Sequence, residues 1–534
     1  MQKPESPARV AESAAPVAPR GVRRACLCAL LLFAAYLAVL GGMAIGRRAP
    51  DFEYFYRAGA YLLEYGQLDQ GMERTPSGAL QPRGTIDWYL PFVSRLMTLI
   101  AWLPWPAAGG LWLAVNLTAF FAVLVLLGRH VMGLPPQDWP VTLLLPVLLL
   151  GLFWHWEFRL NQIDVLTLLL VVASFVHWQQ GRGALGGFWL GLAALVKLTP
   201  LLLVVWYALK RQFRTAAIAL LTVAVAGPVA DVVVFGPAYA GDAYRRWLRA
   251  ALADGSHRGL VLRQKEMDWR NQGLGAVASR WLHPTNYALH FDNDPRIRTH
   301  KRPAMMNVVD LPLTTIAGLV SGAVGAALAG LLWLTRRPAR ALSTWQLRAE
   351  WALVVLAMLW LMPVLRRYHL IMLLPALAVL ASGVHYAGRR RAWSKLALGG
   401  IGGVVACQLA VATRALPETG LVRRLAPLLG PQTAARISQA LDAGIVEASG
   451  LLLLTVVLLA IPLIALLHKL GRDPDALPRH AWGCQRVGRY CPPPVAGPLL
   501  TSPAGRPAAS ERGGAIPERR QVTKLFDDRA MPEL

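Results

Sequence analysis

Charged residues are scarce in this chain, and long polar segments are absent. Only 16% of the 534 residues are Asp, Glu, Lys or Arg, whereas 55% are hydrophobic. No stretch is long and polar enough to form an independent soluble domain. This balance excludes a soluble globular protein and is typical of a protein with many membrane-spanning helices.

Acidic residues are the scarcer of the charged types, with 30 Asp and Glu against 55 Lys and Arg. The resulting net charge of +25 could indicate nucleic-acid binding. However, the arginines are dispersed among loops between apolar segments, and no basic polar domain accompanies them. Such charge is typical of topology signals beside anionic lipid, so we predict a lipid-bilayer partner and no nucleic acid.

Cysteine is also rare, with five residues in the chain. Three of them (Cys26, Cys28 and Cys407) lie in apolar segments, where cysteine is a small buried hydrophobe. Cys484 and Cys491 lie near the C-terminus without a nearby histidine cluster. These positions argue against a zinc site or a disulfide framework, and no His, Asp and Glu group has ligand spacing, so we predict no metal and no cofactor.

Apolar segments recur along the chain, and a helix needs about 20 apolar residues to cross a bilayer. We therefore predict an all-α, polytopic membrane protein. Residues 90–103 are too short to cross and have flanking Tyr, Trp and Pro, which favours a helix in the outer interface. The twelve predicted spans are 25–45, 109–127, 141–156, 165–178, 188–196, 201–209, 216–235, 311–334, 351–361, 370–386, 396–412 and 451–467.

The positions of Lys and Arg predict the orientation of these spans. If residues 90–103 do not span the membrane, the short turns rich in Lys and Arg lie on the cytoplasmic side. If this segment crossed the bilayer, the clusters at 210–214 and 389–391 would lie outside. We predict a cytoplasmic N-terminus of residues 1–24, a membrane domain of 25–468 and a disordered cytoplasmic tail of 469–534, which is rich in Pro, Arg, Gly and Ala.

In this topology, polar residues gather at the outer ends of the spans. Charged groups at membrane depth are costly and usually face a cavity or a partner, so these residues are candidates for a site. They are Asp51, Glu53, Arg159, Asn161, Gln162, Asp164, Lys197, Trp269, Arg270, Asn271, Gln272, Arg366, Arg367, Tyr368 and His369.

Several of these residues belong to motifs between residues 51 and 375. The run that ends at Pro200 is the most specific of these motifs, and any single one would be weak. On these motifs the chain resembles glycosyltransferase family 87, part of the GT-C superfamily. The motifs are Asp51-Phe52-x-Tyr54-x-Tyr56-x-Ala58, Tyr89-x-Pro91, the Gln162 turn, Gly187-x-x-x-Gly191-Leu192-Ala193-Ala194-Leu195-Val196-Lys197-Leu198-Thr199-Pro200, Asn271-Gln272-Gly273-Leu274, and Pro363 through His369 to Pro375.

The resemblance implies a GT-C type fold and a transferase that uses a polyprenyl-phosphate sugar, typically mannose, at the extracytoplasmic face. It also implies a bacterial inner membrane location and a catalytic base at Asp51. The acceptor would be a glycolipid, a polysaccharide or a protein. Substrate-binding roles are predicted for Glu53, Tyr56, Arg159, Gln162, Asp164, Lys197, Asn271, Gln272, Arg366, Arg367 and His369.

The chemistry of a lipid phosphate donor agrees with a single base. A glycosidase needs a second carboxyl group because a sugar alkoxide leaves poorly. A phosphate leaves without protonation, so one carboxylate that accepts the acceptor's hydroxyl proton is enough. Cations then hold the phosphate, and the candidates are Lys197, Arg366, Arg367 and Arg159.

Other interpretations remain open from the sequence. A secondary transporter would also have charged residues in its membrane domain, although internal repeats are not evident. A non-catalytic lipid-binding scaffold would keep the basic residues without requiring Asp51. Individually, Asp51 also suits a helix N-cap, Lys197 also suits an interfacial anchor, and Asn271 and Gln272 also suit the cap of a loop helix.

Overall fold

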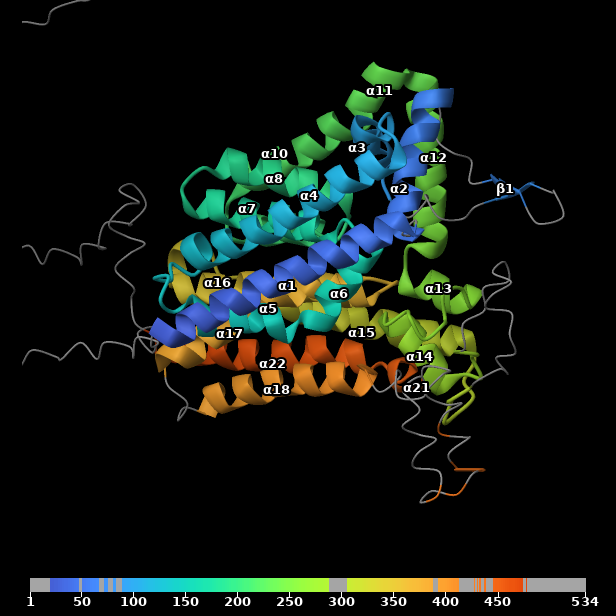
Figure 1. The fold of residues 1–534 in the computed structure, drawn as a ribbon. Helices are drawn as coiled ribbons and strands as arrows, with labels where there is room; N and C mark the ends of the chain where they lie inside the picture. Colours follow the sequence, from blue (N-terminus) through green and yellow to red (C-terminus); the bar gives the residue numbers. More distant parts are fainter. Residues whose placement is uncertain are drawn as a thin grey trace, which may run out of the picture. The chain divides into compact units, whose positions relative to one another are not determined.

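Figure 1 shows the fold as a computed structural model. The described residues are 20–47, 50–66, 72–74, 80–82, 89–287, 305–387, 392–412 and 445–473, with a few isolated positions between 427 and 477. They are mostly helical, and β1 (Met72–Arg74) and β2 (Leu80–Pro82) form one short antiparallel pair. The predicted all-α class is confirmed for this part of the chain. The predicted termini, residues 1–24 and 469–534, lie mostly outside the described residues.

The first half of the chain contains the segments that carry Asp51, Gln162 and Lys197. Its helices are α1 (Arg20–Gly46), α2 (Pro50–Tyr65), α3 (Pro91–Ala101), α4 (Trp105–Val125), η2 (Leu126–Val131), η3 (Pro140–Leu144), α5 (Leu145–Leu149), α6 (Gly151–Leu160), α7 (Asp164–Gln179), α8 (Gly183–Val196), α9 (Leu201–Leu209), α10 (Phe213–Ala224), η4 (Val225–Val229) and α11 (Ala230–Phe235).

The second half begins with a loop region of short helices and continues into long apolar ones. Its helices are α12 (Pro237–Asp254), α13 (His257–Arg263), α14 (Leu274–Leu282), α15 (Leu313–Leu334), η5 (Ala339–Ala341), α16 (Thr344–Leu361), η6 (Arg367–Leu373), α17 (Leu374–Ala387), α18 (Ala392–Ala412), α21 (Ile445–Ala448) and α22 (Leu451–Arg472).

Seven helices among the described residues are long and apolar enough to cross a membrane, and a bent pair could add an eighth. The prediction of twelve spans is therefore not confirmed by helix length. Helices α7, α8 and α9, which we predicted as spans, have 16, 14 and 9 residues. The predicted helix at 90–103 is present as α3, and its place in the interface stays a prediction. The seven are Arg24–Gly46, Trp105–Val131, Phe213–Phe235, Leu313–Leu334, Arg367–Ala387, Ala392–Ala412 and Leu451–Arg472.

The segment that we predicted as one span at 141–156 is broken. Its two parts, Pro140–Leu149 and Gly151–Leu160, meet at an angle of 58°. At the break, Leu150 has φ −95° and ψ 18°, outside the α-helical region, and Gly151 follows. Glycine next to a non-helical residue is a common cause of such a bend. The bend directs α6 toward η6, against which it packs.

Helix α16 begins seven residues earlier than the span that we predicted at 351–361. Ser343 and Gln346 form a capping box at its start. The prediction was wrong because Arg348 and Glu350 were excluded from an apolar span, yet both are buried. Glu350 forms an ion pair with Lys210 at the end of α9, and this pair makes burial of its charge possible.

Lys210 also joins two of the predicted cytoplasmic turns. Its Nζ atom donates to the carbonyl oxygens of Thr335 at 2.6 Å and Arg337 at 2.7 Å. These carbonyls lie at the end of α15, where the last backbone groups of a helix lack intrahelical partners. The basic ends of α9 and α15 therefore meet at one end of the bundle, as the predicted topology requires.

Glycines allow α8 and α10 to pack closely. A Cβ atom on Gly191 would lie 2.6 Å from the Ala219 carbonyl oxygen and 2.5 Å from Thr222 Cβ. Gly187 faces the Thr215 backbone one turn earlier. Small residues at such spacing let helix backbones approach in a membrane, which explains this part of the most specific motif.

We expect Gly191→Ala to lower the free energy of unfolding by about 1–3 kcal/mol, because the added methyl group overpacks this contact. The control is Gly322→Ala on α15, where no atom lies within 4 Å of an added Cβ. That variant should be neutral or slightly stabilising, since Ala is the better helix former. Thermal unfolding in detergent measures both. Equal behaviour of the two variants would contradict the close packing of α8 on α10.

Candidate active site

Four segments that are far apart in the sequence meet around Asp51. They are the start of α2, the turn between α6 and α7, the end of α8, and the segment that joins α16 to η6. Helix η6 packs against α6, α7 and α16, and α7 packs against α8. The fold therefore brings together most of the polar residues that the sequence placed at the outer ends of the spans.

Asp51 lies in the first turn of α2, where an acidic side chain interacts well with the free N–H groups. Its Oδ2 atom accepts a hydrogen bond from Gln162 Nε2. Gln162 is held in a tight turn, because Asn161 has a left-handed backbone with φ 48°. Asn116 Nδ2 then donates to the Gln162 carbonyl oxygen at 3.0 Å. The sequence motifs around Asp51 and Gln162 therefore meet in space.

The charge state of Asp51 reflects two opposing effects. Burial raises the pKa of its carboxyl group above the usual value. The hydrogen bond from Gln162 and the positive charges of Arg366, Arg270 and Lys197 lower the pKa, but by less than burial raises it. A carboxylate with a raised pKa is a better proton acceptor than one at the ordinary value. Asp51 is thus a carboxylate facing three cations.

Lys197 and Asp164 form a buried ion pair beside it. Lys197 Nζ donates to Asp164 Oδ1 at 2.6 Å. His369 Nε2 lies 4.0 Å from the other oxygen, Asp164 Oδ2. Because His369 Nδ1 accepts the backbone N–H of Arg366 at 3.0 Å, a neutral ring carries its proton on Nε2. The predicted residues Asp164, Lys197 and His369 therefore belong to one cluster.

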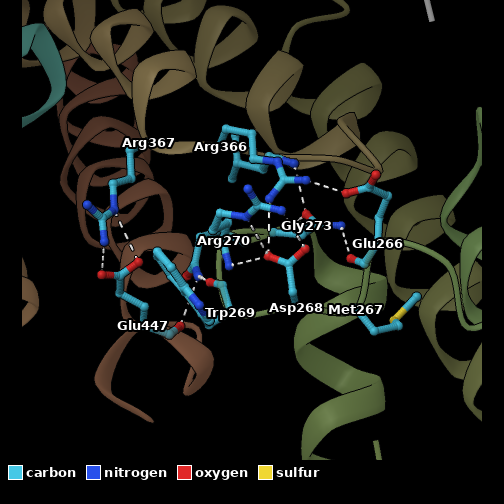
Figure 2. Close-up of polar contacts among 12 residues, drawn as sticks. Glu266, Met267, Asp268, Trp269, Arg270, Gly273, Arg366, Arg367 and Glu447 are labelled. Atoms are coloured by element: carbon cyan, nitrogen blue, oxygen red, sulfur yellow. Dashed lines mark hydrogen bonds and ion pairs between the residues drawn. The ribbon is translucent and has the colours of Figure 1, made fainter. Parts of the chain in front are cut away.

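Arg366 is fixed by acids from the loop before α14, as Figure 2 shows. Its guanidinium pairs with Glu266 and with Asp268 Oδ1, the latter at 3.3 Å. Arg270 Nε donates to the same Asp268 oxygen at 3.1 Å. Burial alone raises the pKa of Asp268, but the charges of Arg366 and Arg270 and the hydrogen bonds from Arg270 lower it to about 2. Asp268 therefore stays ionised and holds two arginines together.

Arg367 points toward a different partner, which Figure 2 also shows. Its Nε atom donates to Glu447 Oε2 at 3.1 Å, and its Nη2 atom pairs with Glu447 Oε1. The guanidinium lies over the rings of Trp156 and Trp269, with centroid distances of 4.6 and 5.2 Å. The two neighbouring arginines are thus held by separate acids.

Asn271 and Gln272 fasten the loop to the segment after α16. Asn271 Oδ1 accepts the N–H groups of Gly273 at 2.8 Å and Leu365 at 3.0 Å. Gln272 Nε2 donates to the carbonyl oxygens of Trp269 at 2.7 Å and Glu447 at 2.9 Å. Both side chains are fully buried. These contacts position Arg270 and Arg366, while direct substrate binding by either residue stays a prediction.

Three other predicted residues make contacts away from Asp51. Glu53 pairs with Arg57 one turn along α2. Tyr56 donates its hydroxyl to the Leu103 carbonyl oxygen at 2.9 Å and so ties α2 to the α3–α4 turn. Arg159 is exposed, and its guanidinium lies 4.9 Å from the Trp156 ring centroid. The fold does not bring these side chains into the Asp51 cluster, and their substrate contacts stay predictions.

Sequence reasoning missed several residues of the site. The sequence places Arg270 in the loop without indicating its role, and it does not indicate that Asp268 pairs with Arg270 and Arg366 or that Glu266 pairs with Arg366. Glu157, one turn before Gln162, is fully buried and accepts the Val165 N–H at 2.9 Å. An acidic residue inside an apolar helix was the signal for Glu157. No sequence signal pointed to Glu447 as the partner of Arg367.

The described residues contain no group of three His, Cys, Asp or Glu side chains placed to hold a metal ion. The positive charges that act on Asp51 are instead those of Arg366, Arg270 and Lys197. The predicted independence from metal stays a prediction for the whole chain.

Comparison with protein families gives one finding. The model of glycosyltransferase family 87 matches residues 88–363, which is slightly more than half of the chain. Comparisons with curated proteins and with solved structures give no match. Gln162, Asp164, Lys197 and Arg270 lie inside the matched segment, whereas Asp51 precedes it and the Arg366–His369 segment follows it.

Proposed function

We propose that this chain, which belongs to glycosyltransferase family 87, transfers mannose from a polyprenyl-phosphate donor to a hydroxyl group at the extracytoplasmic face of the membrane. The chain is a glycosyltransferase, and its long apolar helices make it an integral membrane protein. We further propose that it lies in a bacterial inner membrane and that its acceptor is a glycolipid, a polysaccharide or a protein.

The observation that carries this proposal is the setting of Asp51. Its carboxylate is held by Gln162, and it faces the positive charges of Arg366, Arg270 and Lys197. A base next to several cations suits a reaction in which one substrate loses a proton while another releases a phosphate. The same cations would serve a binding scaffold, but such a protein would not need a partly buried carboxylate among them.

In the proposed reaction, Asp51 accepts the proton of the acceptor hydroxyl. The hydroxyl oxygen then forms a bond to the anomeric carbon of the donor sugar. The bond between that carbon and the phosphate oxygen breaks, and the phosphate leaves with the electron pair. No acid is required, because a phosphate is stable as an anion. Cations that already face the leaving oxygen stabilise the charge that develops there.

Two of these cations are oriented by their own carboxylates. Asp164 holds the Lys197 ammonium, and Asp268 with Glu266 holds the Arg366 guanidinium. We infer that a donor phosphate shares these cations with the carboxylates, which fix the directions of their N–H groups. Hydrogen bonds between a phosphate and charged donors are about twice as strong as neutral ones.

The distribution of basic residues supports the proposed face. The ends of the helices away from Asp51 carry Lys210 and Arg211 after α9, and Arg336 and Arg337 after α15. Short loops with excess Lys and Arg are cytoplasmic as a rule. The Asp51 cluster is then extracytoplasmic, where a lipid-linked sugar is the available donor.

The proposed donor is tested by supplying membranes that contain the protein with polyprenyl phosphate carrying labelled mannose. We expect label to appear in an acceptor fraction. Its amount should be at least about tenfold higher than in membranes that lack the protein, because the uncatalysed transfer is far slower than the catalysed one. GDP-mannose supplied without a lipid carrier is the parallel arm. Label from GDP-mannose alone would contradict the lipid donor, and transfer of a different lipid-linked sugar would contradict mannose.

A further inference from the structure

A second group of polar side chains, buried or partly buried, lies at the end of the bundle away from Asp51. It consists of Arg348 in the first turns of α16, His385 and Tyr386 in the last turn of α17, and Asp138 just before η3. Arg348 precedes the end of α16 by 13 residues, or roughly 20 Å at 1.5 Å per residue, and Arg366 lies beyond that end. This group is therefore separate from the candidate active site.

Arg348 is the unusual member of the group. It is only 9% exposed, and it takes part in no hydrogen bond or ion pair with the described residues. Its Nε atom is buried without a partner. The centroid of the Trp345 ring lies 5.3 Å from its guanidinium carbon, so an aromatic face is the contact that this charge makes. A buried charge without a counter-charge is costly, so native proteins rarely keep one unless something binds it.

The nearby acid does not serve as that counter-charge. Tyr386 donates its hydroxyl to Asp138 Oδ2 at 2.6 Å, and His385 Nε2 lies 3.5 Å from Asp138 Oδ1. One oxygen of Asp138 is thus hydrogen-bonded by α17, the other lies beside His385, and neither pairs with Arg348. Arg348 also lies close to Gly133, where an added Cβ would be 3.7 Å from Nη2. Gly133 has a left-handed backbone with φ 60°, which favours glycine, so position 133 places no side chain against the guanidinium.

The charge of Arg348 itself, together with the basic sequence that follows α17, indicates an anion as the missing partner. Three consecutive arginines, 389–391, follow the end of α17 after one intervening residue in the sequence. A planar guanidinium with several N–H donors matches the oxygens of a phosphate. Basic pockets between helices on the cytoplasmic side are a known setting for anionic lipid head groups, since that leaflet is negatively charged.

We propose that Arg348 is the centre of a site that binds the phosphate of an anionic lipid head group, at the end of the bundle opposite to Asp51. The phosphate would accept hydrogen bonds from the Arg348 guanidinium, and the lipid chains would remain in the bilayer. This site is independent of the proposed transfer reaction. Its occupancy would fasten the starts of α16 and η3 to the end of α17.

The test uses the full-length protein, purified in a neutral detergent. Phosphatidylglycerol, phosphatidylcholine or inorganic phosphate is added, and the thermal unfolding temperature is measured. Native mass spectrometry records the lipid that is retained. We expect phosphatidylglycerol to raise the unfolding temperature by several degrees, because a ligand that binds only the folded state stabilises it. Phosphatidylcholine should have little effect.

The variant is Arg348→Gln, which keeps the length of the side chain without its charge. We expect the effect of phosphatidylglycerol to disappear and lipid retention to fall roughly tenfold. In the absence of lipid this variant should be at least as stable as the wild type, because it removes an unpaired buried charge. The control is Arg340→Gln, which changes an exposed arginine near the start of the same helix.

Three results would overturn the proposal. One is an equal response of Arg348→Gln and the wild type to phosphatidylglycerol, and another is no response of the wild type. The third is equal stabilisation by inorganic phosphate and by phosphatidylglycerol, which would leave a phosphate site but exclude the lipid as its source. If Arg348→Gln fails to fold, Arg348→Lys replaces it, since this change keeps the charge but loses the forked geometry.

Discussion

Asp51→Asn should lower the rate of sugar transfer by about 100-fold or more, because a positioned general base contributes roughly that factor or more. Asparagine keeps the size of the side chain and an oxygen that can accept the Gln162 hydrogen bond, but it does not take up the acceptor's proton. Since burial already disfavours the ionised form of Asp51, the neutral side chain should not harm the fold. The measurement is transfer from labelled polyprenyl-phosphate mannose in membranes at matched expression.

The matched control for this variant is Glu64→Gln. Glu64 lies on the same helix, and its side chain is exposed. Removing its charge should change transfer by less than about twofold, because exposed charges contribute little to stability or structure. Full activity in Asp51→Asn would show that Asp51 only caps α2. Equal loss in both variants would indicate general damage to α2 and not the loss of a base.

The second large effect is expected at the buried pair of Lys197 and Asp164. Replacing either residue alone, as Lys197→Met or Asp164→Asn, leaves its partner without compensation in a buried setting. Breaking such a pair usually costs about 3–5 kcal/mol of stability. The double variant removes both charges and should recover most of that loss. Thermal unfolding in detergent measures the three variants.

The rate of sugar transfer distinguishes two roles of the Lys197–Asp164 pair, one purely structural and one in which it binds the donor phosphate. If Lys197 holds the donor phosphate, the double variant should fold yet transfer sugar about 100-fold more slowly, the usual cost of removing a group that stabilises developing charge. If the pair is only structural, restored stability should bring restored transfer. Lys469→Met is the control, because Lys469 pairs with Asp473 at an exposed helix end and should change stability by less than about 1 kcal/mol.

The grouping of Asp51, Gln162, Asp164, Lys197 and His369 could be predicted from the sequence. Apolar helices that cross a bilayer place their connecting turns alternately at two ends, so polar turns at one end must be neighbours. The charges of the short turns then indicate which end is which. This reasoning requires only helix order and does not depend on the packing angle of any pair.

The pairings within the site could not be predicted in this way. Arg366 and Arg367 are adjacent in the sequence, yet one pairs with Glu266 and Asp268 and the other with Glu447. Their directions depend on the backbone of a short segment and on a loop without helical periodicity. Pattern reasoning also relies on apolar runs, so it missed the start of α16, where Glu350 is buried because Lys210 neutralises it.

The predicted number of membrane spans was not confirmed, for a related reason. Reasoning from the sequence pattern counts each apolar run between basic turns as one membrane span. However, α7, α8 and α9 are short, and the segment around Leu150 is bent. Neighbouring helices can satisfy the backbone of short or broken helices in a membrane protein, so length alone does not fix their role.

The contact between Arg367 and Glu447 has a consequence for how the protein is made. Glu447 follows Asp51 by 396 positions (447 − 51), and its backbone carbonyl also receives the Gln272 side chain. At about 5–20 residues per second, a ribosome needs roughly 20 to 80 s to travel that distance. Arg367 precedes Glu447 by 80 positions (447 − 367), so it lacks this partner for roughly the last 4 to 16 s of that time. The site is therefore completed only when α22 enters the membrane, near the end of synthesis.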